Sequence, residues 1–128
     1  MSTADASRAA LRADGETILR KAIRAVLPDE AVRRALAGVQ FPGRVFLVAA
    51  GKAAWQMASV AREVLPTLAG GVVVTKYGHA KGPIDGVACY EGAHPVPDEN
   101  GLRGTEAALA LTEGLRADDT VLFLLSGG

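Results

Sequence analysis

Two apolar runs, each followed by small residues, dominate the hydrophobic pattern of this chain. The first is the stretch 44–52, which ends in Gly-Lys, and the second is the stretch 120–128, which ends in Ser-Gly-Gly. The first run is nearly continuous and does not alternate with polar residues, which is typical of a strand covered on both faces of a sheet. We therefore expect a buried strand that leads into a tight Gly-Lys turn at the start of a helix, and a second apolar strand that leads into small residues.

Helical spacing of apolar residues separates these strands. Four segments show it: 7–27 with a break near Gly15, then 29–36, 52–65 and 99–115. Pro28 is expected to end the first helix, because proline is poorly tolerated inside a helix. Asp29 and Asp98 are expected N-caps of the second and fourth helices, because an aspartate side chain can accept hydrogen bonds from free amides there.

Two further short strands are expected at 72–75 and 87–91, each followed by a loop rich in glycine or proline. Strands that alternate with helices indicate an α/β fold with a parallel or mostly parallel sheet and helices on its faces. In such sheets ligands bind beyond the carboxyl ends of the strands. The sequence therefore predicts that the polar residues after each strand share one edge of the sheet.

Composition and charge exclude several classes of protein. With 128 residues the chain is at most one domain. The 14 Lys and Arg residues balance 14 Asp and Glu residues, so the basic surface of a nucleic-acid-binding protein is not expected. No apolar run approaches the roughly 18 residues of a membrane span, so no membrane partner is expected. Cys89 is the single cysteine, which excludes an internal disulfide and favours a reducing, cytoplasmic location.

The Gly51-Lys52 pair is the first candidate site. A lysine in the first turn of a helix faces the positive end of the helix dipole, at a cost of roughly 0.3–1 kcal/mol. An anion bound between the lysine and the backbone amides would reverse that cost; otherwise Lys52 is an exposed lysine that the site tolerates. The pair is not part of a Walker A loop, because Ala53 follows the lysine and the required upstream glycine is missing.

The second candidate is Ser126-Gly127-Gly128, directly after the most apolar strand. Glycines allow the backbone to approach a ligand closely, and consecutive amides can form an anion-binding nest. The alternative is an ordinary turn between a strand and a helix.

Four polar residues on neighbouring loops are further candidates. His79 and His94 could each act as a general base, form a hydrogen bond with a substrate, or be structural. Lys76 could attract substrate charge or only be solvated. Asp98 could hold a metal or a hydroxyl group, although its expected role as an N-cap explains it equally well. No cluster of residues predicts a metal site.

Four motifs in order resemble the N-terminal portion of type II glycerate 2-kinases, many of which bear the name hydroxypyruvate reductase. They are the segments 51–58, 71–79, 92–101 and 119–128. The resemblance covers nearly the whole chain from about residue 8. It implies a larger, Rossmann-like N-terminal domain and a smaller C-terminal domain that closes over a cleft. It also implies transfer of the ATP γ-phosphoryl group to the 2-hydroxyl of D-glycerate with a divalent cation, normally Mg²⁺.

The resemblance also assigns roles to individual residues. Lys52 takes the place of the family's active-site lysine, and the segment 126–128 matches the start of its glycine-rich phosphate or substrate loop. Gly51, Lys76, His94 and Asp98 are expected to bind substrate or nucleotide. Phosphoryl transfer needs positioning and charge neutralisation more than covalent chemistry, so these residue types suit it.

Members of this family continue well beyond the Ser-Gly-Gly motif. We therefore expect this chain to be a truncated part of the larger domain, with a helical lead-in over 1–40, alternating strands and helices over 44–128, and no C-terminal domain. Such a piece is expected to be inactive or nearly so. Two alternatives remain: an NAD(P)H-dependent hydroxypyruvate reductase, although no G-x-G-x-x-G follows the first strand, and a non-catalytic fragment that buries its open sheet in a homodimer.

Overall fold

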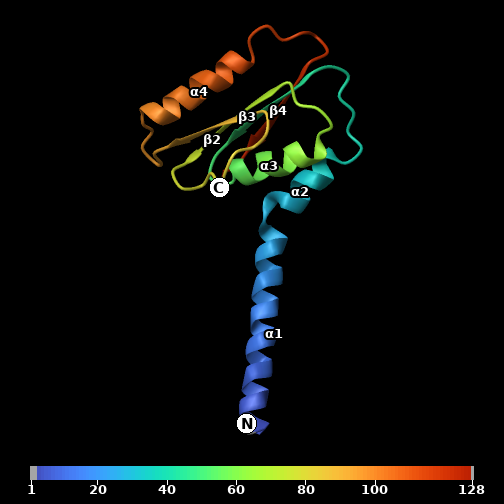
Figure 1. The fold of residues 1–128 in the computed structure, drawn as a ribbon, viewed down its shortest axis with the longest axis vertical. Helices are drawn as coiled ribbons and strands as arrows, with labels where there is room; N and C mark the ends of the chain where they lie inside the picture. Colours follow the sequence, from blue (N-terminus) through green and yellow to red (C-terminus); the bar gives the residue numbers. More distant parts are fainter. Residues whose placement is uncertain (1–2, 128) are drawn as a thin grey trace.

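A computed structural model describes residues 3–127 and places four parallel strands in one sheet with helices on both of its faces (Figure 1). In chain order the elements are α1 (Thr3–Val26), α2 (Pro28–Leu36), β1 (Val45–Ala50), α3 (Ala54–Val64), β2 (Gly70–Lys76), β3 (Val87–Gly92), α4 (Glu99–Leu111) and β4 (Thr120–Leu125). This arrangement confirms the predicted α/β fold class with a parallel sheet.

The strand order β3-β2-β1-β4 explains where the helices lie. From β1 the chain steps to β2 and then β3, and afterwards it returns to the other side of β1 to form β4. Right-handed crossovers in opposite directions place their helices on opposite faces. Accordingly α3 packs with α2 on one face, and α4 packs against β2 and β3 on the other (Figure 1). The change of direction between β1 and β4 is a topological switch point, where α/β sheets bind their ligands.

The core lies between the sheet and α3. Leu47 of β1 and Val73 of β2 are fully buried there. The face of α3 that meets them is built from small residues, because Ala54, Ala58 and Ala61 are all fully buried. Small side chains allow the helix to approach the strands closely, so alanine and valine fill this interior where aromatic residues are scarce.

The opposite face owes its close packing to a glycine. A Cβ atom at Gly104 of α4 would lie 2.8 Å from the Tyr90 Cβ and 2.9 Å from the Val74 Cγ2. Gly104 is itself buried. The absence of a side chain therefore lets α4 lie directly on β2 and β3, which accounts for a helix-weakening residue in the middle of a helix.

The first helix differs from its prediction. α1 runs without the expected break at Gly15, because one glycine costs only about 1 kcal/mol in a helix. α1 extends away from the rest of the molecule (Figure 1). Its apolar side chains are more than half exposed: Leu11, Ile18, Leu19, Ile23 and Val26. No helix within residues 3–127 has the length and apolar character needed to cross a membrane.

The second helix begins one residue earlier than predicted. Pro28 does not only end α1 but occupies the first position of α2, with Leu27 at the cap position and no side-chain cap. The fixed φ of proline suits the first helical turn, and its missing N–H is not needed there. Asp29 is therefore inside the helix, and its predicted role as the N-cap is wrong. Its carboxylate accepts a hydrogen bond at 3.0 Å from Gln56 Nε2 of α3.

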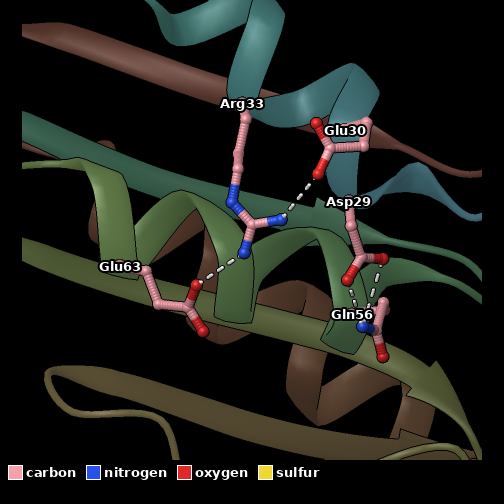
Figure 2. A network of polar contacts seen from close by, with 5 residues as sticks. All are labelled: Asp29, Glu30, Arg33, Gln56 and Glu63. Carbon is pink, nitrogen blue, oxygen red and sulfur yellow. Dashed lines mark hydrogen bonds and ion pairs between the residues drawn. The ribbon is translucent and has the colours of Figure 1, made fainter.

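A polar network holds α2 against α3 at the surface (Figure 2). Arg33 of α2 lies between Glu30, at 3.4 Å, and Glu63 of α3, at 3.0 Å. The side chains are 41%, 75% and 60% exposed, so these ion pairs contribute little to stability.

An ion pair at the amino ends of the strands ties β1 to β4. Asp119 is almost fully buried and accepts hydrogen bonds from the Arg44 backbone N, at 3.1 Å, and from Arg44 Nε, at 3.0 Å. The Arg44 guanidinium and the Arg116 amide hold the pKa of Asp119 well below its usual range. The same contact raises the pKa of Arg44. This pair lies at the opposite end of the strands from the candidate site.

Candidate functional site

The carboxyl ends of all four strands surround a pocket of about 270 Å³ at the switch point. Its lining includes six of the predicted site residues: Gly51, Lys52, Lys76, His94, Ser126 and Gly127. The other lining residues are Ala50, Val74, Thr75, Gly92 and Ala93. Gly128, which was also predicted, lies outside the described residues. The topology thus brings together segments that are far apart in the sequence.

The turn after β1 requires a glycine. Gly51 has a φ of +107°, which side chains other than hydrogen rarely allow, and a Cβ there would collide with the Ser126 carbonyl oxygen. The Gly51 N–H donates to Val74 O at 3.1 Å, and the Ser126 N–H donates to Ala50 O at 2.8 Å. The backbone after β1 is therefore clamped between the ends of β2 and β4.

Lys52 lies in this turn and not in the first turn of the helix, since α3 begins at Ala54. Its side chain is exposed. The next amide, of Ala53, donates to Ser126 Oγ at 3.1 Å. Ser126 thus satisfies an amide at the start of α3 from a distant part of the chain, where no local side chain caps the helix.

The pocket concentrates positive charge in a chain of zero net charge. Lys52 and Lys76 both line it and are exposed, and no Asp or Glu is among its described lining residues. The amino-terminal end of α3 adds the positive end of a helix dipole. A concave site lined by one sign of charge favours a small anion such as a carboxylate or a phosphate.

Two side chains hold the turn from below the pocket rim. Thr75, buried at the end of β2, donates from Oγ1 to Gly51 O at 2.9 Å. His79, a candidate general base in the sequence, has its ring Nδ1 3.0 Å from Lys52 O and is not among the residues that line the pocket. Thr75 was not predicted, although a polar residue at the carboxyl end of an apolar strand is a signal that could have indicated it.

The remaining candidates separate into two kinds. His94 lines the pocket and is exposed. Asp98 does not line it; it caps α4 as predicted, because its Oδ1 accepts from Gly101 N at 3.0 Å. Its Oδ2 accepts from the Tyr77 hydroxyl at 2.6 Å, and Asn100 Nδ2 donates to that hydroxyl at 2.7 Å. A role for Asp98 in binding a ligand stays a prediction.

The Tyr77–Asp98 contact also perturbs both groups. The hydrogen bond from Tyr77, together with that from the Gly101 amide, lowers the pKa of Asp98. The same carboxylate raises the pKa of Tyr77. The pair joins the loop after β2 to the start of α4, and His94 lies in the segment between β3 and α4.

The polar groups that line the pocket suit an anion better than a metal ion. Within residues 3–127 no group of three or more His, Cys, Asp or Glu side chains lies close enough together to hold a metal ion. Mg²⁺ prefers carboxylate oxygens, which the described lining lacks. Ammonium groups and backbone amides are instead the partners that phosphate and carboxylate groups prefer.

Comparisons with known proteins identify the family to which the sequence is similar. A family model described as "Domain of unknown function (DUF4147)" matches residues 14–128. A D-glycerate 2-kinase of Thermotoga maritima is 55% identical over 112 residues, which are 87% of this chain and 27% of the relative. A glycerate 2-kinase of Pyrococcus horikoshii is 35% identical, over 92% of this chain and 29% of the relative. A relative in Agrobacterium vitis that bears the name hydroxypyruvate reductase is 42% identical over 67% of this chain.

Solved structures show the same fold. The crystal structure of a glycerate kinase from Thermotoga maritima matches with a TM-score of 0.79 and 51% identity, over 92% of this chain and 28% of that one. A protein of Pyrococcus horikoshii matches with a TM-score of 0.77 and 33% identity, over 92% of this chain and 29% of that one. The chain therefore spans less than a third of the length of these relatives.

Proposed function

Because this chain belongs to the DUF4147 family of glycerate 2-kinases and matches the N-terminal portion of its members, we propose that it serves the ATP-dependent phosphorylation of D-glycerate to 2-phosphoglycerate. The observation that supports the proposal most strongly is the small pocket at the switch point, with two lysines and no carboxylate in its described lining. Both glycerate and the transferred phosphoryl group are anions, so this lining is complementary to either.

In this proposal Lys52 neutralises the glycerate carboxylate or the phosphoryl group in transfer, and Lys76 adds to the local positive potential. The backbone at Gly51 and Gly127 would allow a ligand to approach closely, and Gly128 is also proposed to bind substrate or nucleotide. Phosphoryl transfer depends mainly on positioning and charge stabilisation. A turn fixed by hydrogen bonds from other elements provides the positioning.

ATP is the proposed phosphoryl donor, because a kinase activity implies a nucleotide. Mg²⁺ is implied by the resemblance to the family and would neutralise phosphate charge when bound. The described pocket residues do not offer the carboxylates that Mg²⁺ prefers, so no ligand for it is assigned among them.

The proposal also concerns the domain organisation. The predicted division of the larger domain into a helical lead-in, residues 1–40, and a part with alternating strands and helices, residues 44–128, stays a proposal. By resemblance, a smaller second domain would close over the pocket. Without such closure a site cannot exclude water or bring together all of its catalytic residues. Residues 1–128 alone are therefore proposed to be inactive or nearly so. A cytoplasmic location is also proposed, since the single cysteine, Cys89, is free.

A hybrid enzyme tests this function. Residues 14–128 would replace the matching segment of the Thermotoga maritima D-glycerate 2-kinase, which supplies the rest of the family's length. With ATP, Mg²⁺ and D-glycerate the hybrid is expected to form 2-phosphoglycerate. Oxidation of NADH with hydroxypyruvate, in place of that product, would support the reductase and overturn the proposal. A hybrid that melts cooperatively but catalyses neither reaction would also contradict it.

Self-association is a second proposal, supported by a specific feature of β4. Within residues 3–127 this strand pairs with β1 alone, so no described strand covers its other edge. Phe123 and Leu125 of β4 are 57% and 67% exposed. An open strand edge flanked by exposed apolar side chains favours pairing with another copy of the same strand, so a homodimer through the sheet is proposed for the isolated chain.

A further inference from the structure

Three consecutive residues of the turn that carries Lys52 are each held by a side chain from another part of the fold. Thr75 Oγ1 donates to Gly51 O at 2.9 Å, and Ser126 Oγ accepts from Ala53 N at 3.1 Å. Between them, the His79 ring Nδ1 lies 3.0 Å from Lys52 O. The anchors come from the end of β2, from the residue after β4 and from the loop between β2 and β3.

The contact with Lys52 O determines which ring nitrogen of His79 carries a proton. A carbonyl oxygen can only accept a hydrogen bond, so Nδ1 of His79 must carry the proton. The neutral Nδ1–H tautomer and the imidazolium both satisfy this requirement. The ring is half-buried, and His79 does not line the pocket. Its Nδ1 is therefore committed to the backbone and is not available to take a proton from a substrate.

We propose that His79 is a positioning residue, which fixes the Lys52 carbonyl and thereby directs the Lys52 side chain toward the anion in the pocket. The inference rests on the proposed function, because it assumes that Lys52 meets an anion there. Lysine has a long and flexible side chain, so the direction of its backbone limits where the ammonium group can lie. Loss of the anchor would spread that group over more positions and weaken anion binding.

Matched substitutions at position 79 separate positioning from other roles. In asparagine the amide Nδ2 lies at the same bond distance from Cβ as histidine Nδ1, so His79→Asn keeps a donor for Lys52 O. Glutamine places its amide one bond further, near the place of Nε2, and His79→Ala removes the donor. Positioning predicts that asparagine restores the contact and that glutamine and alanine do not.

The experiment uses the 128-residue chain and its three variants, with D-glycerate as the probe. First, ¹⁵N NMR of the histidine rings without ligand should show His79 as the Nδ1–H tautomer, with His94→Ala used for assignment. Second, titration at fixed ionic strength should give a Kd about tenfold weaker for the alanine and glutamine variants, and within about twofold of the parent for His79→Asn.

Several results would overturn the inference. A neutral ring protonated at Nε2 cannot donate from Nδ1 to Lys52 O, and unchanged affinity in His79→Ala would show that the anchor has no effect. Equal loss in the asparagine and glutamine variants would indicate that the imidazole itself meets the ligand. If the parent chain does not bind D-glycerate, the proposed function loses support. The ring tautomer measured by NMR still decides whether His79 donates a hydrogen bond to Lys52 O.

Discussion

His94 lines the pocket from the loop after β3, and its role can be separated by two substitutions in the hybrid enzyme. We expect His94 to bind substrate or nucleotide through a hydrogen bond. His94→Ala should then raise KM by about tenfold with little change in kcat, while His94→Gln, which keeps a hydrogen-bonding side chain, should recover most of the loss. Steady-state kinetics with D-glycerate and ATP provide the measurement.

The contrary result would be a loss of kcat shared by both His94 variants. General-base catalysis contributes about 10²–10⁴-fold, and glutamine cannot take up a proton at neutral pH. Such a loss would make His94 the base that activates the 2-hydroxyl group of the substrate.

At the scale of single residues, the sequence predicted which polar residues follow the carboxyl ends of strands. Lys52 follows the buried strand β1 and Ser126 follows the half-exposed strand β4, so their meeting at one sheet edge followed from the parallel arrangement. The partners of Thr75 and His79 could not be predicted, because they lie 24 and 27 residues away in the chain and depend on which strands are neighbours. Strand order is decided by the packing of both helical layers, which the hydrophobic pattern does not encode.

At the scale of elements, the packing of α4 gives a prediction with an internal control. Gly104→Ala should lower the free energy of unfolding by about 1–3 kcal/mol, because the new methyl group would overlap Tyr90 and Val74. Gly101→Ala lies in the same helix, where the methyl group would meet Asp98 Oδ1 at an ordinary 3.5 Å. It should raise stability by roughly 0.5 kcal/mol. Urea unfolding measures the free energy of unfolding of both variants. Equal changes in Gly104→Ala and Gly101→Ala would contradict this packing of α4.

The ion pair that joins β1 to β4 predicts a dependence of stability on pH. The folded state lowers the pKa of Asp119 below its unfolded value of about 3.9. Its contribution is therefore present above about pH 4 and is lost as the pH falls further. Asp119→Asn should lower the midpoint of urea unfolding at pH 7. It should also make the decrease of that midpoint between pH 7 and pH 3 smaller than in the parent chain. Part of that drop should persist, because the pKa of Asp98 is also lowered.

The exposed carboxylate of Asp14 on α1 provides the control for this measurement. Asp14→Asn removes the same charge without touching the strands and should leave the drop unchanged. An Asp119→Asn variant with the full drop of the parent would show that its contact with Arg44 does not couple folding to pH.

The boundaries of several helices differ from their predictions for identifiable reasons. α2 begins at Pro28 because proline fits the first helical turn, and α3 begins after Lys52 because the positive φ of Gly51 interrupts the helical path. α4 ends at Leu111, and Gly114 turns the chain with a φ of +67°. Sequence periodicity predicted each helix but not the residue at which tertiary contacts end it.

At the scale of the whole molecule, the open edge of β4 predicts self-association. Phe123→Glu places a charge beside this edge and should convert a concentration-dependent dimer into a monomer in sedimentation velocity experiments. Ile18→Glu on α1, at a residue that is also exposed, is the matched control and should leave the dimer intact. A parent chain that stays monomeric at high concentration would contradict the proposal, and dissociation only in Ile18→Glu would place the interface on α1.

The central claim is that Lys52, held at the switch point of the sheet, meets the anion of a phosphoryl-transfer reaction. In the hybrid enzyme Lys52→Ala should reduce kcat/KM for D-glycerate by about 100-fold or more. Lys81→Ala removes the same charge from an exposed position that does not line the pocket, and its rate should stay within about twofold of the parent hybrid. Equal rates for the Lys52→Ala and Lys81→Ala hybrids would contradict the account.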